Sequence, residues 1–279
     1  MTISGKAKLA GVMGWPVGHS RSPRLHGFWL EQYDIDGAYV PMAVRPEHLQ
    51  AALRALPKLG FRGCNLTVPH KEAAIPLLDR IDDAARHIGA VNTVIVEADG
   101  TLTGRNTDAP GFIANLRQGA PGLTLDGATA MVIGAGGAAR GIVAGLIEAG
   151  VVEIKLANRS PEKASAIAHG FEPYVVTVPW DERADRMDDL DLLVNTTSLG
   201  MTGQPPLDLP LDGLPRKAVV TDAVYAPLET DLLARARARG NPVVDGLGML
   251  LHQAVPGFAA WFGVEPEVTE ELRRHVLGA

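Results

Sequence analysis

The feature that most constrains the fold of this chain is a glycine-rich segment between an apolar run and a helical pattern. The apolar run 129–133 leads into Gly134-Ala-Gly-Gly-Ala-Ala139, where the helical pattern begins. This is the G-x-G-x-x-A order of dinucleotide-binding βαβ units, and the flanking strand and helix make it a better explanation than a glycine-rich turn that binds nothing. Gly134 permits the tight turn, and Gly136 lets the backbone approach a pyrophosphate. The predicted cofactor contacts are Gly134, Ala135, Gly136, Gly137 and Ala138.

The end of the following strand indicates which dinucleotide binds. An NAD site has Asp or Glu about 20 residues after the glycines, where it binds the ribose hydroxyls. Here the strand 153–157 ends in Asn158-Arg159-Ser160, without a carboxylate. The Arg159 guanidinium can make a two-pronged contact with a 2′-phosphate, Ser160 can donate to it, and Lys163 adds charge one turn later. Ser160 also suits a helix cap, which is compatible with phosphate binding, so the sequence favours NADP.

The pattern of apolar runs predicts an α/β fold. In the second half of the chain, strands are expected at 129–133, 153–157, 174–178, 190–195, 218–224 and 242–244, with helices between most of them. This alternation is typical of a parallel sheet covered by helices on both faces. A chain of 279 residues has the length of about two domains, so a separate α/β domain is expected in the first half.

The first half is expected to contain three strands, three helices and a hairpin. The strands lie at 9–14, 38–44 and 61–68, the helices at 23–33, 46–56 and 71–81, and the hairpin at 91–96 and 101–105. Pro76 should shorten or kink the third helix. The segment 118–127 is rich in glycine and proline and has the composition of a linker. Helices are expected again at 247–262 and 265–277.

Composition and charge argue against several classes of protein. The net charge is −6 and the pI is about 5.8, whereas nucleic-acid-binding proteins usually carry a basic stripe. Cys64 is the single cysteine, so no intrachain disulfide can form, and the scattered histidines give no metal-ligand set. The uncharged stretch 246–264 is long enough for a membrane span, but His252 and Pro256 near its middle favour a buried core helix. We expect a cytoplasmic protein with no metal and no nucleic-acid or membrane partner.

Polar residues gather after the first and third predicted strands. Ser20 and Ser22 precede a helix; capping explains Ser22, but two hydroxyls at a helix start can also hold a carboxylate. Asn65 and Thr67 alternate at the end of a strand and therefore point to one face. Lys71 begins the next helix, where a cation opposes the helix dipole, so surface charge alone explains it poorly. These residues are candidates for a substrate site.

Two further polar residues stand out in and after the predicted hairpin. Asn92 lies within an apolar strand, and a buried amide needs hydrogen-bond partners, which a polyhydroxylated ligand would supply. Asp108 is well explained as the N-cap of a helix starting at Ala109. His70 is more typical of a packing or capping histidine than of a base, and nothing in the sequence promotes it.

The chain resembles the shikimate dehydrogenase family almost from end to end. The motifs follow the family's order: Ser20-x-Ser22, Asn65-x-Thr67-x-Pro69-x-Lys71, Ala90-Val-Asn-Thr93, Asn106-Thr-Asp108, Gly134-Ala-Gly-Gly, Asn158-Arg-Ser160, Asn195-Thr-Thr-x-x-Gly-Met201, Asp222-x-x-Tyr225 and Gly246-x-Gly-Met249-x-x-x-Gln253. Each motif is weak by itself, but the ordered set is highly specific.

This resemblance implies the reversible reduction of 3-dehydroshikimate to shikimate by NADPH, on the route to chorismate and the aromatic amino acids. It implies that Ser20 and Ser22 hold the substrate carboxylate. The ring hydroxyls would be bound by Thr67, Lys71, Asn92, Asp108 and Gln253, with Asn65 in support and Tyr225 also reaching the substrate. Near the nicotinamide would lie Ala223, Gly246 and Met249, and Asp83 would make a weaker cofactor contact.

The resemblance also implies the catalytic pair and the domain plan. Lys71, paired with Asp108, would act at the ketone oxygen, either by transferring its proton or by stabilising the alkoxide, and the sequence leaves these two roles open. Residues 1–108 and 246–279 would form the substrate-binding domain. Residues 109–245 would form a Rossmann-type, doubly wound NADP-binding domain, in a protein that is a monomer or a homodimer.

Other functions remain as alternatives. The nearest is a quinate or aminoshikimate dehydrogenase of the same family, possibly with NAD, although Arg159 and the missing acidic residue argue against NAD. A short-chain dehydrogenase is disfavoured because no tyrosine has a lysine four residues later. A non-catalytic NADP-binding regulator on this scaffold should have lost Lys71 or Asp108, and both are present.

Overall fold

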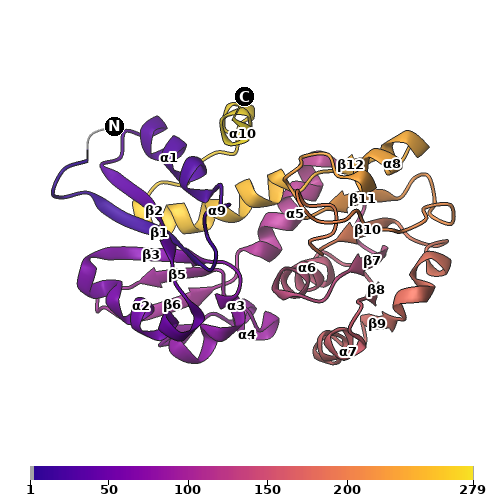
Figure 1. The fold of residues 1–279 in the computed structure, drawn as a ribbon, viewed down its shortest axis with the longest axis horizontal. Helices are drawn as coiled ribbons and strands as arrows, with labels where there is room; N and C mark the ends of the chain where they lie inside the picture. Colours follow the sequence, from indigo (N-terminus) through magenta and orange to yellow (C-terminus); the bar gives the residue numbers. More distant parts are fainter. Residues whose placement is uncertain (1–2, 279) are drawn as a thin grey trace. The chain divides into compact units, whose positions relative to one another are not determined.

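The computed structural model describes residues 3–278, which form two units (Figure 1). Unit 1 runs to Thr107 and resumes at Leu250, and unit 2 comprises Asp108–Met249. The boundaries expected from the resemblance lie after residue 108 and before residue 246. Each unit contains a six-stranded sheet with helices, so the expected α/β architecture is confirmed.

Unit 1 is built on a mixed sheet with the strand order β2-β1-β3-β5-β6-β4. The strands are β1 (Lys8–Gly14), β2 (Gly37–Ala43), β3 (Phe61–Leu66), β4 (Arg80–Ile81), β5 (Thr93–Val96) and β6 (Leu102–Arg105). β1 is parallel to β2 and β3, and β5 is antiparallel to β3 and β6. Because β1 and β3 are parallel neighbours, the segments that follow them leave the sheet at the same edge.

The helices of unit 1 include one that starts in unit 2. They are α1 (Ser22–Gln32), α2 (Leu49–Ala55), α3 (His70–Ala73), α4 (Asp83–Ile88), α10 (Glu270–Leu277) and α9 (Leu247–Phe262), with 3-10 turns η1 (Pro46–His48), η2 (Pro57–Leu59) and η3 (Ile75–Leu77). α9 passes from unit 2 into unit 1 at Leu250. In unit 1 its Phe258 ring lies 5.2 Å from the Trp29 ring of α1, centroid to centroid.

The uncharged stretch near the C-terminus is a core helix, as predicted. Phe258, Trp261 and Phe262 of α9 are almost fully buried, and Trp261 Nε1 donates to the carbonyl of Val94 at 3.0 Å. Within residues 3–278, no helix combines the length and the apolar character that a membrane span requires.

One predicted helix of unit 1 is wrong over most of its length. Where a helix was expected at 71–81, α3 ends at Ala73, η3 follows, and β4 then joins the sheet beside β6. Pro76 lies in η3, and a proline has no N–H to continue a helical ladder. It therefore ends the helix rather than kinking it, and the apolar residues beyond it line a turn and a short strand.

Helix α4 was not predicted from the sequence, although both of its ends carry ordinary signals. The Asp82 carboxylate accepts the backbone N–H of Ala85 at 2.7 Å, which caps the first turn. Gly89 follows the last turn with φ of 72°, a conformation that favours glycine. α10 begins at Glu270, later than the expected residue 265, because Thr269 caps it.

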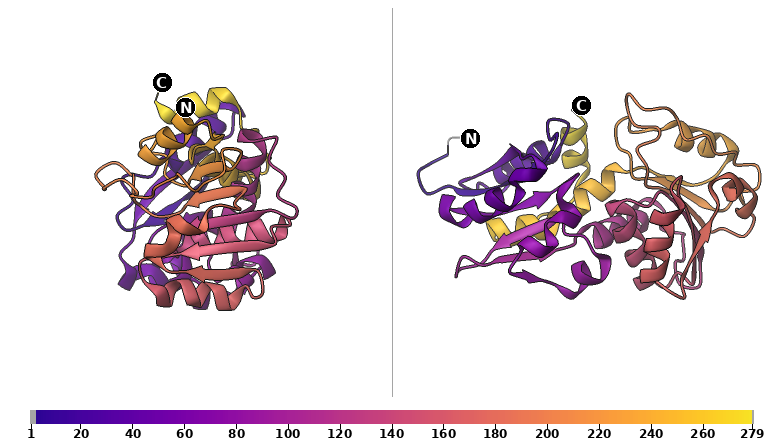
Figure 2. Two further views of the ribbon diagram at one scale, coloured as in Figure 1. Left: turned by 90° about the vertical axis from the view of Figure 1, so that its right-hand side faces the viewer. Right: turned by 60° about the horizontal axis from the view of Figure 1, so that its bottom comes forward.

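Unit 2 is built on a parallel sheet with the strand order β12-β11-β10-β7-β8-β9, seen from two further sides in Figure 2. The strands are β7 (Thr129–Ile133), β8 (Glu153–Ala157), β9 (Val175–Val178), β10 (Leu192–Asn195), β11 (Val219–Asp222) and β12 (Val243–Val244). All six were predicted, several of them longer. The chain adds β8 and β9 on one side of β7 and then β10, β11 and β12 on the other, which is the switch that defines doubly wound dinucleotide-binding sheets.

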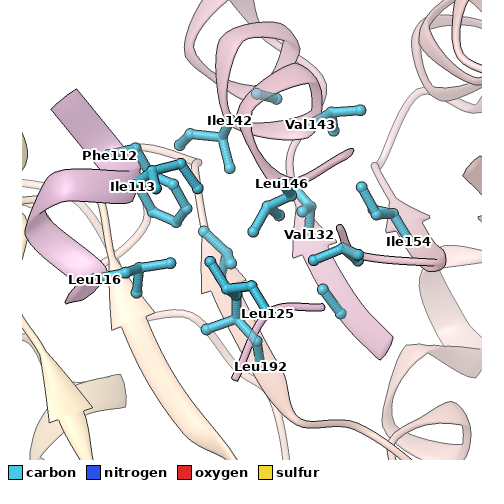
Figure 3. Packing of buried hydrophobic residues seen from close by; sticks show 14 of the residues in the cluster. Phe112, Ile113, Leu116, Leu125, Val132, Ile142, Val143, Leu146, Ile154 and Leu192 are labelled. Carbon is cyan, nitrogen blue, oxygen red and sulfur yellow. The ribbon is translucent and has the colours of Figure 1, made fainter. Parts of the chain in front are cut away.

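Helices cover both faces of the unit 2 sheet. They are α5 (Asp108–Gly119), α6 (Gly137–Glu148), α7 (Pro161–Gly170) and α8 (Asp231–Arg239), with a 3-10 segment η4 (Trp180–Arg186). Val132 of β7 packs in one core with Phe112, Leu116 and Leu146 of α5 and α6 (Figure 3). The neighbouring residue, Ile133, points to the opposite core, which contains α8. Burial on both faces explains why these strands are nearly continuous apolar runs.

The segment 118–127 is not a linker between domains. Its first two residues end α5, and the remainder joins α5 to β7 inside unit 2. Leu125 is buried in the same core as Phe112. Its glycines and its single proline lie within one unit, so the composition of the segment did not indicate its place in the fold.

Candidate active site

The candidate cofactor residues of unit 2 meet at one edge of its sheet. Ala157, Ile133, Asn195 and Asp222 end four adjacent parallel strands and are paired in register across them. The residues that follow these strand ends therefore leave the sheet side by side. In open α/β sheets, ligands bind at the carboxyl ends of the strands, next to the point where the strand order reverses.

The two glycines of the fingerprint serve different purposes. Gly134 has φ of 111°, and a Cβ there would lie 2.5 Å from Thr196 Oγ1 and 3.0 Å from Thr197 Cγ2. Gly136 is the N-cap of α6, with φ of −96°, and a Cβ there would meet nothing within 4 Å. Gly134 thus makes the turn, whereas the exposed Gly136 leaves open space before the N–H groups of a twelve-residue helix.

The turn after β8 presents a basic group that has no partner among residues 3–278. The Asn158 side chain donates to the carbonyl of Ser160 at 3.0 Å and so shapes the turn. Ser160 is the N-cap residue of α7, but its hydroxyl makes no capping bond. Arg159 and Lys163 are exposed, and the Arg159 side chain has no hydrogen bond or ion pair with any residue that the structure describes.

The segment after β11 carries two of the residues assigned by resemblance. Ala223 and Tyr225 are half-buried there. Gly246 packs tightly against this segment, because a Cβ on it would lie 2.6 Å from the backbone of Asp222 and Ala223. Met249 is buried in the core beneath α5 and α6.

In unit 1, the structure corrects the expected role of Ser22 as a helix cap. The N-cap of α1 is Arg21, without a side-chain bond, and Ser22 is the first helical residue. The Ser20 Oγ accepts the backbone N–H of Ser22 at 3.3 Å, so the two serines are adjacent. Burial raises the pKa of the Tyr39 phenol, and a side-chain hydrogen bond with Ser22 opposes that shift.

Asn65 is held on all sides by the protein. Its Oδ1 accepts the Tyr39 hydroxyl at 2.6 Å, and its Nδ2 donates to the Asn92 carbonyl at 3.1 Å and to Thr93 Oγ1 at 3.2 Å. These bonds fix the orientation of the Asn65 amide. Thr67, just beyond β3, is half-buried, and its methyl group occupies the space that a side chain on Gly14 would need.

Asn92 finds its partners within the chain, where the sequence analysis expected a ligand to supply them. Its Oδ1 accepts the backbone N–H of Thr107 at 2.8 Å, which fixes the orientation of the amide. Its Nδ2 donates to Thr107 Oγ1 at 3.0 Å and to Gln253 Oε1 at 3.2 Å. Thr107 is buried, and its hydroxyl donates to the Gln253 carbonyl, so it connects Asn92 to Gln253. Thr107 was named from the sequence only as part of a motif.

The remaining candidates differ in exposure. Lys71 is half-buried in the short helix α3, and Asp108 is a buried residue that begins α5 rather than capping it. His70 is fully buried with Nε2 2.8 Å from the Val44 carbonyl, which agrees with a packing role. Asp83 is exposed in the first turn of α4, where a carboxylate also stabilises the helix dipole.

These features define a dinucleotide-binding α/β protein whose other unit presents a cluster of polar side chains. Three family models match the chain: the shikimate dehydrogenase substrate binding domain at residues 12–94, shikimate / quinate 5-dehydrogenase at 116–201, and the shikimate 5′-dehydrogenase C-terminal domain at 246–277. The chain belongs to the shikimate dehydrogenase family, and the resemblance noted from its motifs is confirmed.

Relatives and solved structures agree with this assignment. The shikimate dehydrogenase (NADP(+)) of Paramagnetospirillum magneticum is 64% identical over 99% of this chain and 100% of its own. The Thermus thermophilus shikimate 5-dehydrogenase, solved with NADP(H) and shikimate, is 38% identical with a TM-score of 0.86, covering 97% and 99% of the two chains. The quinate dehydrogenase of Corynebacterium glutamicum, solved with NAD, is 34% identical with a TM-score of 0.91, covering 98% and 99%.

Proposed function

We propose that this chain catalyses the reversible reduction of 3-dehydroshikimate to shikimate with NADPH, a step in the biosynthesis of the aromatic amino acids. Arg159 is the observation that carries the choice of cofactor. It is exposed and has no described partner at the end of β8, where an NAD-dependent protein has an acidic residue. The names of the relatives, which are NADP(+)-dependent shikimate dehydrogenases, support the choice of substrate.

A single set of assays tests this proposal. NADPH or NADH formation is followed with shikimate and with quinate, each with NADP and with NAD. We expect turnover to be fastest with shikimate and NADP. Faster turnover of quinate would favour the second candidate, quinate dehydrogenase, which the similarity to the Corynebacterium glutamicum structure keeps open.

In the proposed reaction, each candidate residue has a definite task. NADPH supplies the hydride to the ketone carbon of the substrate. The Lys71 ammonium stabilises the negative charge that develops on the ketone oxygen and donates a proton to it. The Asp108 carboxylate accepts a hydrogen bond from a ring hydroxyl. Ser20 and Ser22 bind the substrate carboxylate; the ring is bound by Thr67, Asn92, Tyr225 and Gln253.

Arg159→Ala should weaken NADP binding selectively. A charge-assisted phosphate contact is worth about 1.5–3 kcal/mol, so the KM for NADP should rise by about ten- to a hundredfold. The KM for NAD should hardly change, because NAD has no 2′-phosphate. Arg216→Ala, which removes another exposed arginine of unit 2, serves as the control. Equal losses with NADP and NAD would contradict the assigned role.

Ser20→Ala should raise the KM for shikimate and leave the KM for NADP unchanged. Loss of one hydroxyl bond to a carboxylate is worth about 1.5–3 kcal/mol, or about a tenfold change or more. Ser4→Ala, at an exposed serine of the same unit, is the control. An unchanged KM for shikimate in Ser20→Ala would remove Ser20 from the carboxylate site.

We also propose that the protein works in the cytoplasm as a monomer or a homodimer. Its single cysteine, Cys64, is a buried free thiol, which suits a reducing compartment. Light scattering coupled to size-exclusion chromatography would measure the oligomeric state, and a mass above that of a dimer would contradict the proposal.

A further inference from the structure

The loop between β11 and α8 contains a buried carboxylate to which the proposed reaction gives no task. Asp222 ends β11 and is 1% exposed. No ion pair to a described lysine, arginine or histidine involves it, although burial raises the pKa of this carboxyl above its ordinary value. A buried carboxylate is costly unless hydrogen bonds replace its hydration, so its partners indicate what it is for.

Each partner of Asp222 can donate a hydrogen bond to its carboxylate. Its Oδ1 accepts the backbone N–H of Val224 at 2.9 Å and the Asn195 Nδ2 at 3.0 Å. The Asn195 amide cannot be reversed, because its Oδ1 accepts the backbone N–H of Thr197 at 3.0 Å. The Asp222 Oδ2 accepts the Thr230 hydroxyl at 2.8 Å, and this hydroxyl in turn accepts the N–H of Leu233. Three donors converge on one carboxylate, which suits its ionised form.

These bonds close the loop 222–230 upon itself. Oδ1 holds the start of the loop through Val224, and Oδ2 holds its end through Thr230, the N-cap of α8. The Ala223 N–H is fixed as well, since it donates to the Asn195 carbonyl at 2.8 Å. Ala223 and Tyr225, the two residues of this loop that the proposed function assigns to cofactor and substrate, lie within the closed segment.

We infer that Asp222 is a positioning residue, which clamps the loop 222–230 through Val224 and Thr230 and so sets the places of Ala223 and Tyr225 in the reaction. This inference rests on the proposed function. Its contribution is geometric: a loop of nine residues without a clamp samples many conformations, and small displacements of groups near the reacting atoms reduce the rate strongly.

Substitutions at Thr230 test the clamp without removing the buried charge. Thr230→Val keeps the shape of the side chain and loses the hydroxyl, whereas Thr230→Ser keeps the hydroxyl. We expect kcat/KM for shikimate to fall by about tenfold in Thr230→Val, as for one lost hydrogen bond to a charged group, and to stay near the wild-type value in Thr230→Ser. Asp222→Asn should reduce kcat/KM for shikimate further, because the new amide N–H groups would face groups that also donate hydrogen bonds.

The matched control separates the clamp from helix capping. Thr269 caps α10 by accepting the Leu272 N–H at 3.1 Å, and its side chain bonds none of the carboxylates that the structure describes. Thr230→Val and Thr269→Val each lose a helix cap, so each should lower the melting temperature by about 2–4 °C. Thr269→Val should leave the kinetics unchanged. If Thr230→Val and Thr269→Val have the same kinetics, Thr230 is merely structural and the inference is overturned.

Two measurements distinguish a displaced loop from damage to unit 2 as a whole. Adenosine 2′,5′-bisphosphate, which lacks the nicotinamide half of NADP, should inhibit Thr230→Val and the wild type with the same Ki; a raised Ki would overturn the inference. Hydrogen exchange should accelerate at 222–230 in Thr230→Val and not in Thr269→Val, and unchanged exchange would also overturn it. Hydrogen exchange is measured without turnover. If the wild-type protein is inactive toward shikimate, the proposed function is refuted, whereas the exchange at 222–230 still tests the clamp.

Discussion

Replacing Lys71 with alanine should lower kcat by at least about 10²-fold, the scale of a lost acid–base group. The partner of the Lys71 ammonium is an oxygen that gains charge only as the hydride arrives. An interaction made only in the transition state changes kcat and kcat/KM together and leaves KM nearly unchanged. Steady-state kinetics with shikimate and NADP, together with a melting curve, would measure this.

Lys58→Ala provides the control for Lys71→Ala, because Lys58 is an exposed lysine of the same unit. Its kcat should equal that of the wild type. Asp108→Asn should behave differently from Lys71→Ala, since Asp108 is also expected to bind a ring hydroxyl: its KM for shikimate should rise while kcat falls. Near-normal kcat in a folded Lys71→Ala protein would rule out the catalytic assignment.

Gly134→Ala and Gly136→Ala should fail in different ways, although both glycines belong to one fingerprint. At Gly134 an alanine would have φ of 111° and a Cβ 2.5 Å from Thr196 Oγ1. Backbone strain of this kind costs about 1–3 kcal/mol and the steric clash adds to it, so Gly134→Ala should lower the stability and raise the KM for NADP at least about tenfold.

At Gly136 the backbone is compatible with alanine, and the added methyl group would meet no described atom within 4 Å. The free energy of unfolding should therefore stay within about 0.5 kcal/mol of the wild-type value. The methyl group would occupy the space where a pyrophosphate must approach, so the KM for NADP should still rise. Urea unfolding and NADP kinetics on both variants check this pair, and a fall in stability for Gly136→Ala equal to that for Gly134→Ala would contradict the explanation.

The sequence predicted unit 2 better than unit 1, for a physical reason. The strands of unit 2 are buried on both faces, so each is a short apolar run between turn residues, and all six were found. In unit 1 the segment 70–81 has the apolar residues of a helix, but Pro76 and the pairing of β4 with β6 divide it into three short elements. Pairing between distant residues is invisible to local periodicity.

For the candidate site, the sequence predicted the burial of a polar side chain more readily than it predicted the partners of that side chain. Asn92 was recognised as a buried amide, yet its bonds to Thr107 and Gln253 depend on residues 15 and 161 positions away. Ser22 stands before a proline, as a cap would, but Arg21 takes that place because the helix begins one residue earlier. Thr107 could have been found because it is the middle residue of the motif Asn106-Thr107-Asp108. Both of its neighbours in this motif are polar, and both are buried in the structure.

During synthesis of this chain, the half that carries the dinucleotide fingerprint is complete first. Unit 2 is a continuous stretch, whereas unit 1 needs its last thirty residues, from Leu250 onward. Trp29 Nε1 donates to the Glu267 carbonyl at 3.1 Å, and Lys8 Nζ donates to the Phe262 carbonyl at 2.8 Å. A growing chain therefore leaves the aromatic face of α1 uncovered until α9 and α10 emerge from the ribosome, and the polar cluster that includes Gln253 is completed only after unit 2 has been synthesised.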